Sequence, residues 1–176
     1  MKYLIILSLM TSWNTSHILF DFNNESDLSD WTIVNDGVMG GISQSDLIIN
    51  ADGNALFSGK VSLDYNGGFA SVRYNPSTID VKGYSKLVIR CKGPANTYQV
   101  RAKSSRRERH SYIEYIDVSE DWQEIEVDMA MMYPAFRGYE MDMPNYPKAV
   151  LDEFAILIGN KRYEEFELEI DWIELR

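Results

Sequence analysis

Hydrophobic and polar residues alternate with a period of two along most of this chain. Such alternation predicts β-strands that have one face in a core and the other in solvent. One further segment, residues 153–159, is apolar almost throughout and predicts a central strand covered on both faces. No segment shows a helical period over a convincing length. The alternating segments are residues 17–22, 55–63, 69–74, 86–91, 98–103, 112–118, 122–129 and 166–175.

Turn-forming residues separate the predicted strands and support the β assignment. Glycine provides backbone conformations with positive φ, and Asn or Asp side chains bond to their own backbone. Many short strands at regular spacing are typical of a β-sandwich or barrel. Residues 131–148 contain three prolines and predict a long surface loop, and such loops are often functional. The turns are residues 35–37, 51–54, 66–68, 75–77, 92–94 and 119–121.

The length and composition indicate one domain. The chain has 176 residues, of which 45% are apolar and 25% charged, and no linker or repeat divides residues 17–176. Residues 1–16 contain a lysine, a short apolar stretch and small polar residues, which is the outline of a signal peptide. That stretch is too short to cross a bilayer, so we expect no membrane-spanning segment. We expect export, to a periplasm, if the segment is a signal, and a cytoplasmic location otherwise.

The net charge of −10 argues against nucleic-acid binding, because phosphate backbones repel an acidic protein. One basic segment interrupts the acidic composition, and no aromatic residue is interleaved with it. We interpret this segment as the solvated tip of a hairpin in preference to an anion site. Its members are Arg101, Lys103, Arg106, Arg107 and Arg109, with His110 beside them.

The residues that could carry catalysis form no recognisable motif. Cys91 is the only cysteine and lies in a strand pattern, so we expect a packed thiol without a histidine partner. A glycosidase would need two carboxylates facing one cleft, and carboxylates are too abundant in this acidic chain for their spacing to indicate such a pair. Residues 21–27 carry oxygen atoms that suit calcium, but they equally form a plain turn. We predict no enzyme activity, no metal and no cofactor.

Three glycine-containing segments have a composition that suits the close approach of loops. They are VNDGVMGGIS (34–43), YNGGFASVR (65–73) and PAFRG (134–138). Paired glycines let two backbones, or a backbone and a ligand, come close together. Asp36 can accept hydrogen bonds from the amides freed in this way, and Arg73 is a suitable guanidinium partner for it. We predict an ion pair between Asp36 and Arg73 that ties two loops together at one end of the sandwich.

Together these segments resemble the CIA30 family, the complex I intermediate-associated protein 30 domain. The resemblance extends from about Phe20 to Ile173. It implies a galactose-binding-domain-like jelly roll, an all-β sandwich of two antiparallel sheets packed face to face. The signature positions that transfer to this chain are Trp31, Asn35, Asp36, Gly37, Met39, Gly40, Gly41, Ser43, Asn66, Gly67, Gly68, Phe69, Ser71, Arg73, Phe136, Arg137 and Gly138.

The resemblance also implies a class of function. Mitochondrial relatives are assembly factors for respiratory complex I, so we expect a non-enzymatic protein that binds another protein as an assembly or chaperone-like factor. The family pattern brings no catalytic residues with it. The alternative is an exported carbohydrate-binding module, because several such modules share this fold, and in that case aromatic and arginine side chains would hold a glycan.

Met39 has two interpretations within the first glycine segment. In one, it fills an irregular gap at a packed corner, as methionine often does. In the other, Met39, the glycine amides and Arg73 or Arg137 line a groove for a polar ligand or a peptide. An exposed apolar patch around Met39 and Phe136 would favour a protein partner, whereas a concave row of Trp and Tyr would favour sugar.

Overall fold

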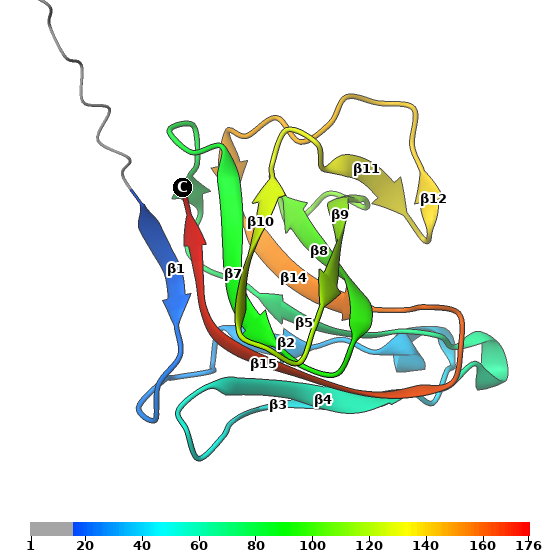
Figure 1. Ribbon diagram of the computed structural model, residues 1–176. Helices are drawn as coiled ribbons and strands as arrows, with labels where there is room; N and C mark the ends of the chain where they lie inside the picture. The colour runs from blue at the N-terminus through cyan, green and yellow to red at the C-terminus, as the bar shows by residue number, and fades with distance from the viewer. Residues whose placement is uncertain (1–15) are drawn as a thin grey trace, which may run out of the picture.

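Two antiparallel β-sheets that share one hydrophobic core form the body of the structure (Figure 1). The computed structural model describes residues 16–176, so the predicted signal segment, apart from Ser16, lies outside the described residues. One sheet has six strands, the other has seven, and a two-stranded ribbon completes the β structure. The prediction of a jelly-roll β-sandwich is confirmed.

The six-stranded sheet is organised around a long C-terminal strand. In order, it consists of β10 (Gln123–Asp128), β7 (Lys86–Lys92), β15 (Glu164–Leu175), β4 (Ala55–Val61) and β3 (Gln44–Ile49), with β1 (His17–Asp21) also paired to β15. The first half of β15 pairs with β4 and its second half pairs with β1. Two strands therefore share one side of β15, and β7 pairs with its other side.

The seven-stranded sheet carries most of the residues discussed below. In order, it consists of β12 (Tyr139–Glu140), β11 (Tyr133–Phe136), β9 (Ser111–Val118), β8 (Asn96–Lys103), β14 (Glu153–Ile158), β5 (Ala70–Tyr74) and β2 (Trp31–Ile33). The ribbon pairs β6 (Ile79–Asp80) with β13 (Val150–Leu151). Two short 3₁₀ turns, η1 (Asp36–Met39) and η2 (Asp64–Asn66), lie in the loops before β3 and β5.

β14 is an inner strand of the seven-stranded sheet. It lies between β5 and β8, and all six of its residues are buried. The continuous apolar run at residues 153–159 therefore predicted a central strand correctly, since a strand covered on both faces has no reason to alternate.

An aromatic cluster joins the N-terminal strands to the core. The Trp31 ring stacks on Tyr74 with ring centroids 4.9 Å apart and meets Phe20 edge-on at 5.4 Å. Phe22 packs against both Phe20 and Trp31. Trp31 belongs to the core, because only 8% of it is exposed. Aromatic pairs of this geometry add to the free energy gained by burial alone.

The prediction of a long surface loop over residues 131–148 is wrong in part. Residues within this segment form β11, which pairs with β9, and β12, which pairs with β11. Met132 and Tyr146 are buried, and the Tyr146 hydroxyl donates a hydrogen bond to the Val150 carbonyl at 2.7 Å. Proline is typical of strands near a sheet edge, where fewer ladder hydrogen bonds are needed, so its presence concealed these strands.

Residues 21–27 form a plain turn. The Asn23 side-chain oxygen accepts a hydrogen bond from the Glu25 amide at 2.9 Å, which is the behaviour of a turn-forming Asn. Within residues 16–176, no three or more His, Cys, Asp or Glu side chains are arranged to hold a metal ion. The same part of the chain contains no helix long and apolar enough to cross a membrane.

Cys91 is a packed thiol, as the strand pattern predicted. It is fully buried, and burial raises the pKa of its thiol to about 12. We expect the native protein to react with a disulfide reagent such as Ellman's reagent at pH 8 at least about a hundredfold more slowly than the unfolded chain, because the thiolate is the reactive form. Stopped-flow absorbance with and without urea measures both rates. Equal rates would mean that the β7–β15 pairing opens readily.

Candidate functional site

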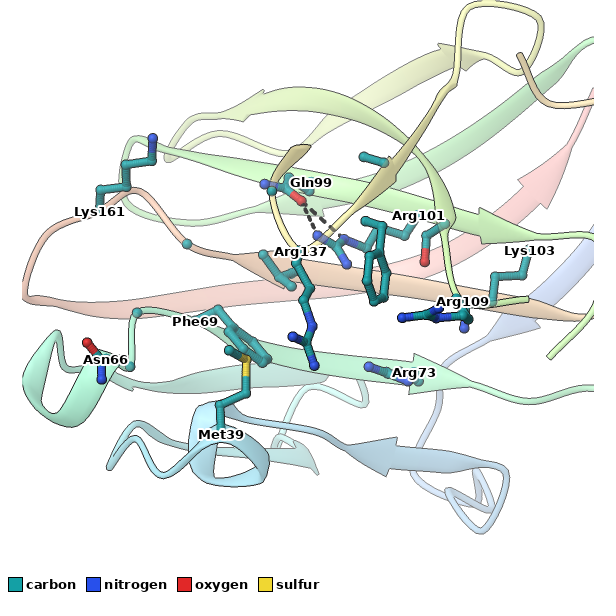
Figure 2. A pocket seen from close by; sticks show the side chains of 18 residues that line it. Met39, Asn66, Phe69, Arg73, Gln99, Arg101, Lys103, Arg109, Arg137 and Lys161 are labelled. Atoms are coloured by element: carbon teal, nitrogen blue, oxygen red, sulfur yellow. Dashed lines mark hydrogen bonds between the residues drawn. The ribbon is translucent and has the colours of Figure 1, made fainter. Parts of the chain in front are cut away.

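A hollow of about 460 Å³ opens on the outward face of the seven-stranded sheet (Figure 2). We call it the cationic hollow, because six of its lining residues are basic and none of the lining residues is acidic. The basic residues are Arg73, Arg101, Lys103, Arg109, Arg137 and Lys161. The other lining residues are Met39, Asn66, Gly67, Gly68, Phe69, Gln99, Ser111, Ala135, Phe136, Gly138, Leu157 and Gly159.

The alternation of side chains along β8 explains why two of the basic residues face the hollow. In β8, Tyr98, Val100 and Ala102 are buried in the core, so the residues between them point to the opposite face of the sheet. Those residues, Gln99, Arg101 and Lys103, line the hollow. The interpretation of the basic segment as a solvated hairpin tip is therefore wrong in part. Arg101, Lys103 and Arg109 line a pocket, whereas Arg106 and Arg107 are exposed in the turn between β8 and β9.

The strand register brings Arg73 and Arg101 to the same row. Ala155 of β14 is the register partner of Arg73 on one side and of Arg101 on the other. Two strand spacings put their Cα atoms roughly 10 Å apart. Ala155 between them is buried and carries only a methyl group.

Arg101 has no carboxylate within ion-pair distance among residues 16–176. Its Nε and Nη2 atoms donate hydrogen bonds to the Gln99 side-chain oxygen at 3.1 and 2.6 Å. Burial, followed by repulsion from Arg73, lowers the pKa of Arg101 to about 10. The guanidinium therefore stays charged at neutral pH, in a place where an anionic ligand would stabilise it.

Arg73 and Lys103 share one buried carboxylate behind the hollow. Glu153 lies 3.9 Å from an Arg73 guanidinium nitrogen and 3.7 Å from the Lys103 ammonium. Both separations are long for ion pairs, so each cation keeps donors free to face the hollow. The predicted ion pair between Asp36 and Arg73 is wrong, because Arg73 has Glu153 as its acidic neighbour.

Asp36 instead binds backbone amides at the end of the sandwich. Its carboxylate accepts hydrogen bonds from the amides of Ser43 at 2.9 Å, Gly68 at 2.7 Å and Phe69 at 3.3 Å, and from the Ser43 hydroxyl. Burial raises the pKa of Asp36, but these hydrogen bonds outweigh burial and hold the pKa below its usual value. The two loops are thus tied together as predicted, but by amides and not by a guanidinium.

The glycine pairs allow this arrangement. A Cβ atom on Gly41 would overlap the Asp36 carboxyl group, and one on Gly67 would overlap both that group and the Ser62 carbonyl. Because the Gly68 and Phe69 amides already donate to Asp36, they are not available to a ligand. The paired glycines therefore allow the close packing of the loops around Asp36. The Gly68 amide is not a free hydrogen-bond donor for a ligand.

A tight turn between β11 and β12 positions Arg137. Arg137 and Gly138 both have positive φ, 52° and 81°, and their neighbours Phe136 and Tyr139 pair across the turn. Such two-residue turns favour glycine because of this conformation. Figure 2 shows Arg137 extending from the turn toward Arg73 and Phe69. The Phe136 ring contacts both Arg137, at 5.4 Å, and Arg109, at 4.9 Å, in cation–π geometry.

Exposed apolar side chains occur in the two segments that bring Met39 and Arg137 to the hollow. Beside η1, Val38 is 72% exposed, Met39 is 52% exposed and Ile42 is 51% exposed. Beside the β11–β12 turn, Tyr139 is 79% exposed, and Met141 and Met143 are partly exposed. The interpretation that Met39 fills a gap at a packed corner is therefore wrong, because Met39 lines the hollow next to Phe69 (Figure 2).

The structure divides the predicted site residues into two groups. The first group lines the hollow and consists of Met39, Asn66, Gly67, Gly68, Phe69, Arg73, Phe136, Arg137 and Gly138. The second group stands behind it, in or next to the Asp36 hydrogen-bond network, and consists of Asn35, Asp36, Gly37, Gly40, Gly41 and Ser43. Sequence reasoning did not assign Gln99, Arg101, Lys103, Arg109 and Lys161 to the site, although the alternation of β8 carries the signal for the first three.

Comparisons with known proteins agree with this architecture. Residues 20–170 match the family model described as Complex I intermediate-associated protein 30 (CIA30). None of the curated protein sequences compared with the chain matches it.

Several solved structures have a similar fold at low sequence identity. A family 11 carbohydrate-binding module from Clostridium thermocellum, in complex with a β-1,3-1,4-mixed-linked tetrasaccharide, is 18% identical with a TM-score of 0.64, covering 91% of this chain and 94% of the module. An agarase is 11% identical with a TM-score of 0.62, covering 91% of this chain and 24% of the agarase. A family 29 carbohydrate-binding module is 11% identical with a TM-score of 0.51, covering 92% of this chain and 91% of the module.

Proposed function

The chain belongs to the complex I intermediate-associated protein 30 (CIA30) family, and on that basis we propose that it is a non-enzymatic protein that binds another protein at the cationic hollow. In this proposal it acts as an assembly or chaperone-like factor. The family description suggests an assembly intermediate of a respiratory complex as the kind of partner.

One observation carries the choice of a protein partner. Exposed apolar side chains lie next in sequence to two residues that line the hollow: Val38 and Ile42 are near Met39, and Tyr139, Met141 and Met143 follow Arg137. Exposed apolar groups gathered around a polar depression are typical of protein contact surfaces, where Met, Tyr and Arg are enriched. Met39 and Arg137 from these two segments both line the hollow.

The composition of the hollow supports a binding role without catalysis. None of the described residues that line it is Asp or Glu. Hydrolysis of a glycoside would need two carboxyl groups on opposite sides of the scissile bond. The hollow offers basic groups where such chemistry would require an acid and a base or nucleophile.

Binding of a carbohydrate is the second candidate. The fold is similar to that of a module solved with a mixed-linked tetrasaccharide, and the hollow has the volume of a small-molecule site. However, no Trp or Tyr lines the hollow in the described part of the chain. Its aromatic residues are Phe69 and Phe136, and Arg109 and Arg137 already contact the Phe136 ring. A neutral sugar would therefore find little free aromatic surface on which to stack.

A site-specific crosslinking experiment tests the proposal. We expect a photoreactive amino acid at Val38, introduced in the native host, to form an adduct with one protein, because Val38 is 72% exposed beside the hollow. Met39→Asp should reduce the adduct and the affinity of the purified partner by about tenfold, since it places a charge in an apolar contact. Mass spectrometry and surface plasmon resonance measure the two effects.

The matched control is Ile48→Asp, which makes the same kind of change at a 47% exposed residue of β3 in the other sheet. It should leave the adduct unchanged. Titration with the β-1,3-1,4-mixed-linked tetrasaccharide tests the second candidate by calorimetry. Saturable sugar binding that Arg137→Ala abolishes, together with no protein adduct, would replace the protein-binding proposal with the carbohydrate one.

A further inference from the structure

We propose that the cationic hollow recognises an acidic segment of the partner, a short extended stretch with at least two carboxylates spaced two residues apart. This inference rests on the proposed protein-binding function and names the chemistry of the partner at that site.

The first argument is the local charge. Six basic residues line the hollow, and Glu153 behind it is the only carboxylate within 4 Å of any of them among residues 16–176. Six positive charges less one leave a local charge of about five positive, in a chain whose net charge is −10. A concave positive site on a negative protein attracts anions to that site and repels them from the rest of the surface.

The second argument is that four of these six cations have no carboxylate partner, whereas most Lys and Arg residues elsewhere in residues 16–176 have one. Arg90 pairs with Asp171 at 2.7 Å, Arg176 with Glu124 at 2.9 Å, and Arg162 with Glu164 at 3.0 Å. In the described part of the chain, no carboxylate lies within 4 Å of Arg101, Arg109, Arg137 or Lys161. Carboxylates are abundant in this chain, yet none lies near these four cations. This suits a site whose anion comes from another molecule.

The third argument is geometric. Planar guanidinium groups bind carboxylates through two parallel hydrogen bonds. Arg73 and Arg101 flank Ala155 with Cα atoms roughly 10 Å apart. Side chains two residues apart in an extended segment lie on the same face about 7 Å apart, so two such carboxylates can reach one guanidinium each. Arg137 extends over the hollow from the β11–β12 turn, where it can contact a bound segment from above (Figure 2).

The fourth argument favours a peptide over other anions. Apolar side chains at Val38, Met39 and Tyr139 would contact the residues that flank the carboxylates, and a peptide supplies such neighbours. A polyphosphate backbone would extend beyond the hollow over an acidic surface. An anionic glycan would match the charge but would make little use of these apolar flanks.

Binding of defined probes to the full chain tests the inference. The first probe is a labelled eight-residue peptide of alternating Glu and Leu, and its matched control has Gln in place of Glu. We expect the Glu peptide to bind at least about tenfold more tightly at low salt, and the difference to shrink severalfold at 300 mM NaCl, since charge contacts are screened. Fluorescence anisotropy measures both. Equal binding of the two peptides would overturn the inference.

The second arm uses variants and competing anions. The double variant Arg109→Gln and Arg137→Gln should weaken Glu-peptide binding by about tenfold or more. Arg107→Gln removes the same charge from an exposed position outside the hollow and should change little. An oligogalacturonate of equal charge that bound tenfold more tightly than the Glu peptide would make the hollow an anionic-glycan site and overturn the inference. Thermal melts confirm that the variants fold.

The inference and the proposed function fail in different ways. If the Val38 adduct forms but is unaffected by the Arg109 and Arg137 substitutions, the chain binds a protein by other means and only the inference is overturned. If the Glu peptide binds as expected but no adduct forms, the chemistry of the hollow is supported and the proposed function is overturned.

Discussion

Asp36→Ala is expected to lower the free energy of unfolding by about 3–5 kcal/mol, the largest loss of stability among the substitutions considered. Asp36 is fully buried, and its carboxylate accepts three backbone amide hydrogen bonds and one from Ser43. Without it, three donors at the junction of two loops lose their acceptor, and each unsatisfied donor costs about 1–3 kcal/mol. A loss of this size would lower the melting temperature by roughly 10 °C in a chain of this length.

The same carboxylate predicts how stability depends on pH. Burial raises the pKa of Asp36, but the hydrogen bonds from Ser43, Gly68 and Phe69 outweigh it and leave the pKa below the usual value of 3.8. A carboxyl group with a depressed pKa stabilises the fold fully above its unfolded pKa, and this contribution is lost as the pH falls through the folded pKa. The wild type should therefore lose stability below about pH 4, and Asp36→Asn should lose less over the same range.

Urea unfolding at pH 7, 4 and 3 measures both effects. The control is Asp121→Ala, which removes an exposed carboxylate from the turn before β10 and should cost less than about 0.5 kcal/mol. If Asp36→Ala unfolds at the same urea concentration as the control, the amides at Gly68 and Phe69 must find another acceptor, and the account of the glycine signature is wrong.

The fold was predictable from the sequence because its main signal is local. Alternation along β4, β7, β8, β9 and β15 reports which face of each strand meets the core, and the uniform apolar run of β14 reports burial on both faces. Strands without clear alternation were missed. β3 lies at a sheet edge, and exposure alternates along it, but its sequence does not follow that alternation: Ser45 is polar on the inner face and Ile48 is apolar on the exposed face.

The site was predictable only in part, where the composition of a single segment indicated how that segment packs. The signature residues around Asp36 and Gly67 do meet, since glycine pairs permit close contact of backbones. The prediction that Arg73 pairs with Asp36 failed because it rested on charge alone. The backbone amides of Gly68 and Phe69 satisfy the Asp36 carboxylate instead. Which cation faces which carboxylate depends on the register of β5, β14 and β8, and no local pattern encodes that register.

The basic segment illustrates the same limit. Alternation alone puts Arg101 and Lys103 opposite the buried Val100 and Ala102, but it does not say what lies across the sheet. The hollow forms only when β14 brings Arg73 alongside and the β11–β12 turn brings Arg137 over the top. Those contacts join residues far apart in sequence, so the charge cluster is a property of the fold.

Glu153→Gln is expected to produce opposite effects on stability and on binding. Glu153 is 7% exposed and is the shared acidic neighbour of Arg73 and Lys103. Its neutral analogue leaves two cations close together with no carboxylate, so the free energy of unfolding should fall by about 2–3 kcal/mol. The same change raises the local positive charge of the hollow and frees both cations, so the Glu peptide should bind about five- to tenfold more tightly.

The comparison with Glu174→Gln separates the two effects. Glu174 is equally buried, at 6% exposed, but it pairs with Arg176 on the six-stranded sheet, away from the hollow. Its substitution should cost stability and leave peptide binding unchanged. If Glu153→Gln instead weakens binding of the Glu peptide, then Glu153 is needed to orient Arg73 and Lys103, and positioning outweighs net charge in the hollow. Tighter binding would mean that the buried carboxylate stabilises the empty hollow at the expense of ligand affinity, the kind of compromise expected where a binding site must also fold without its ligand.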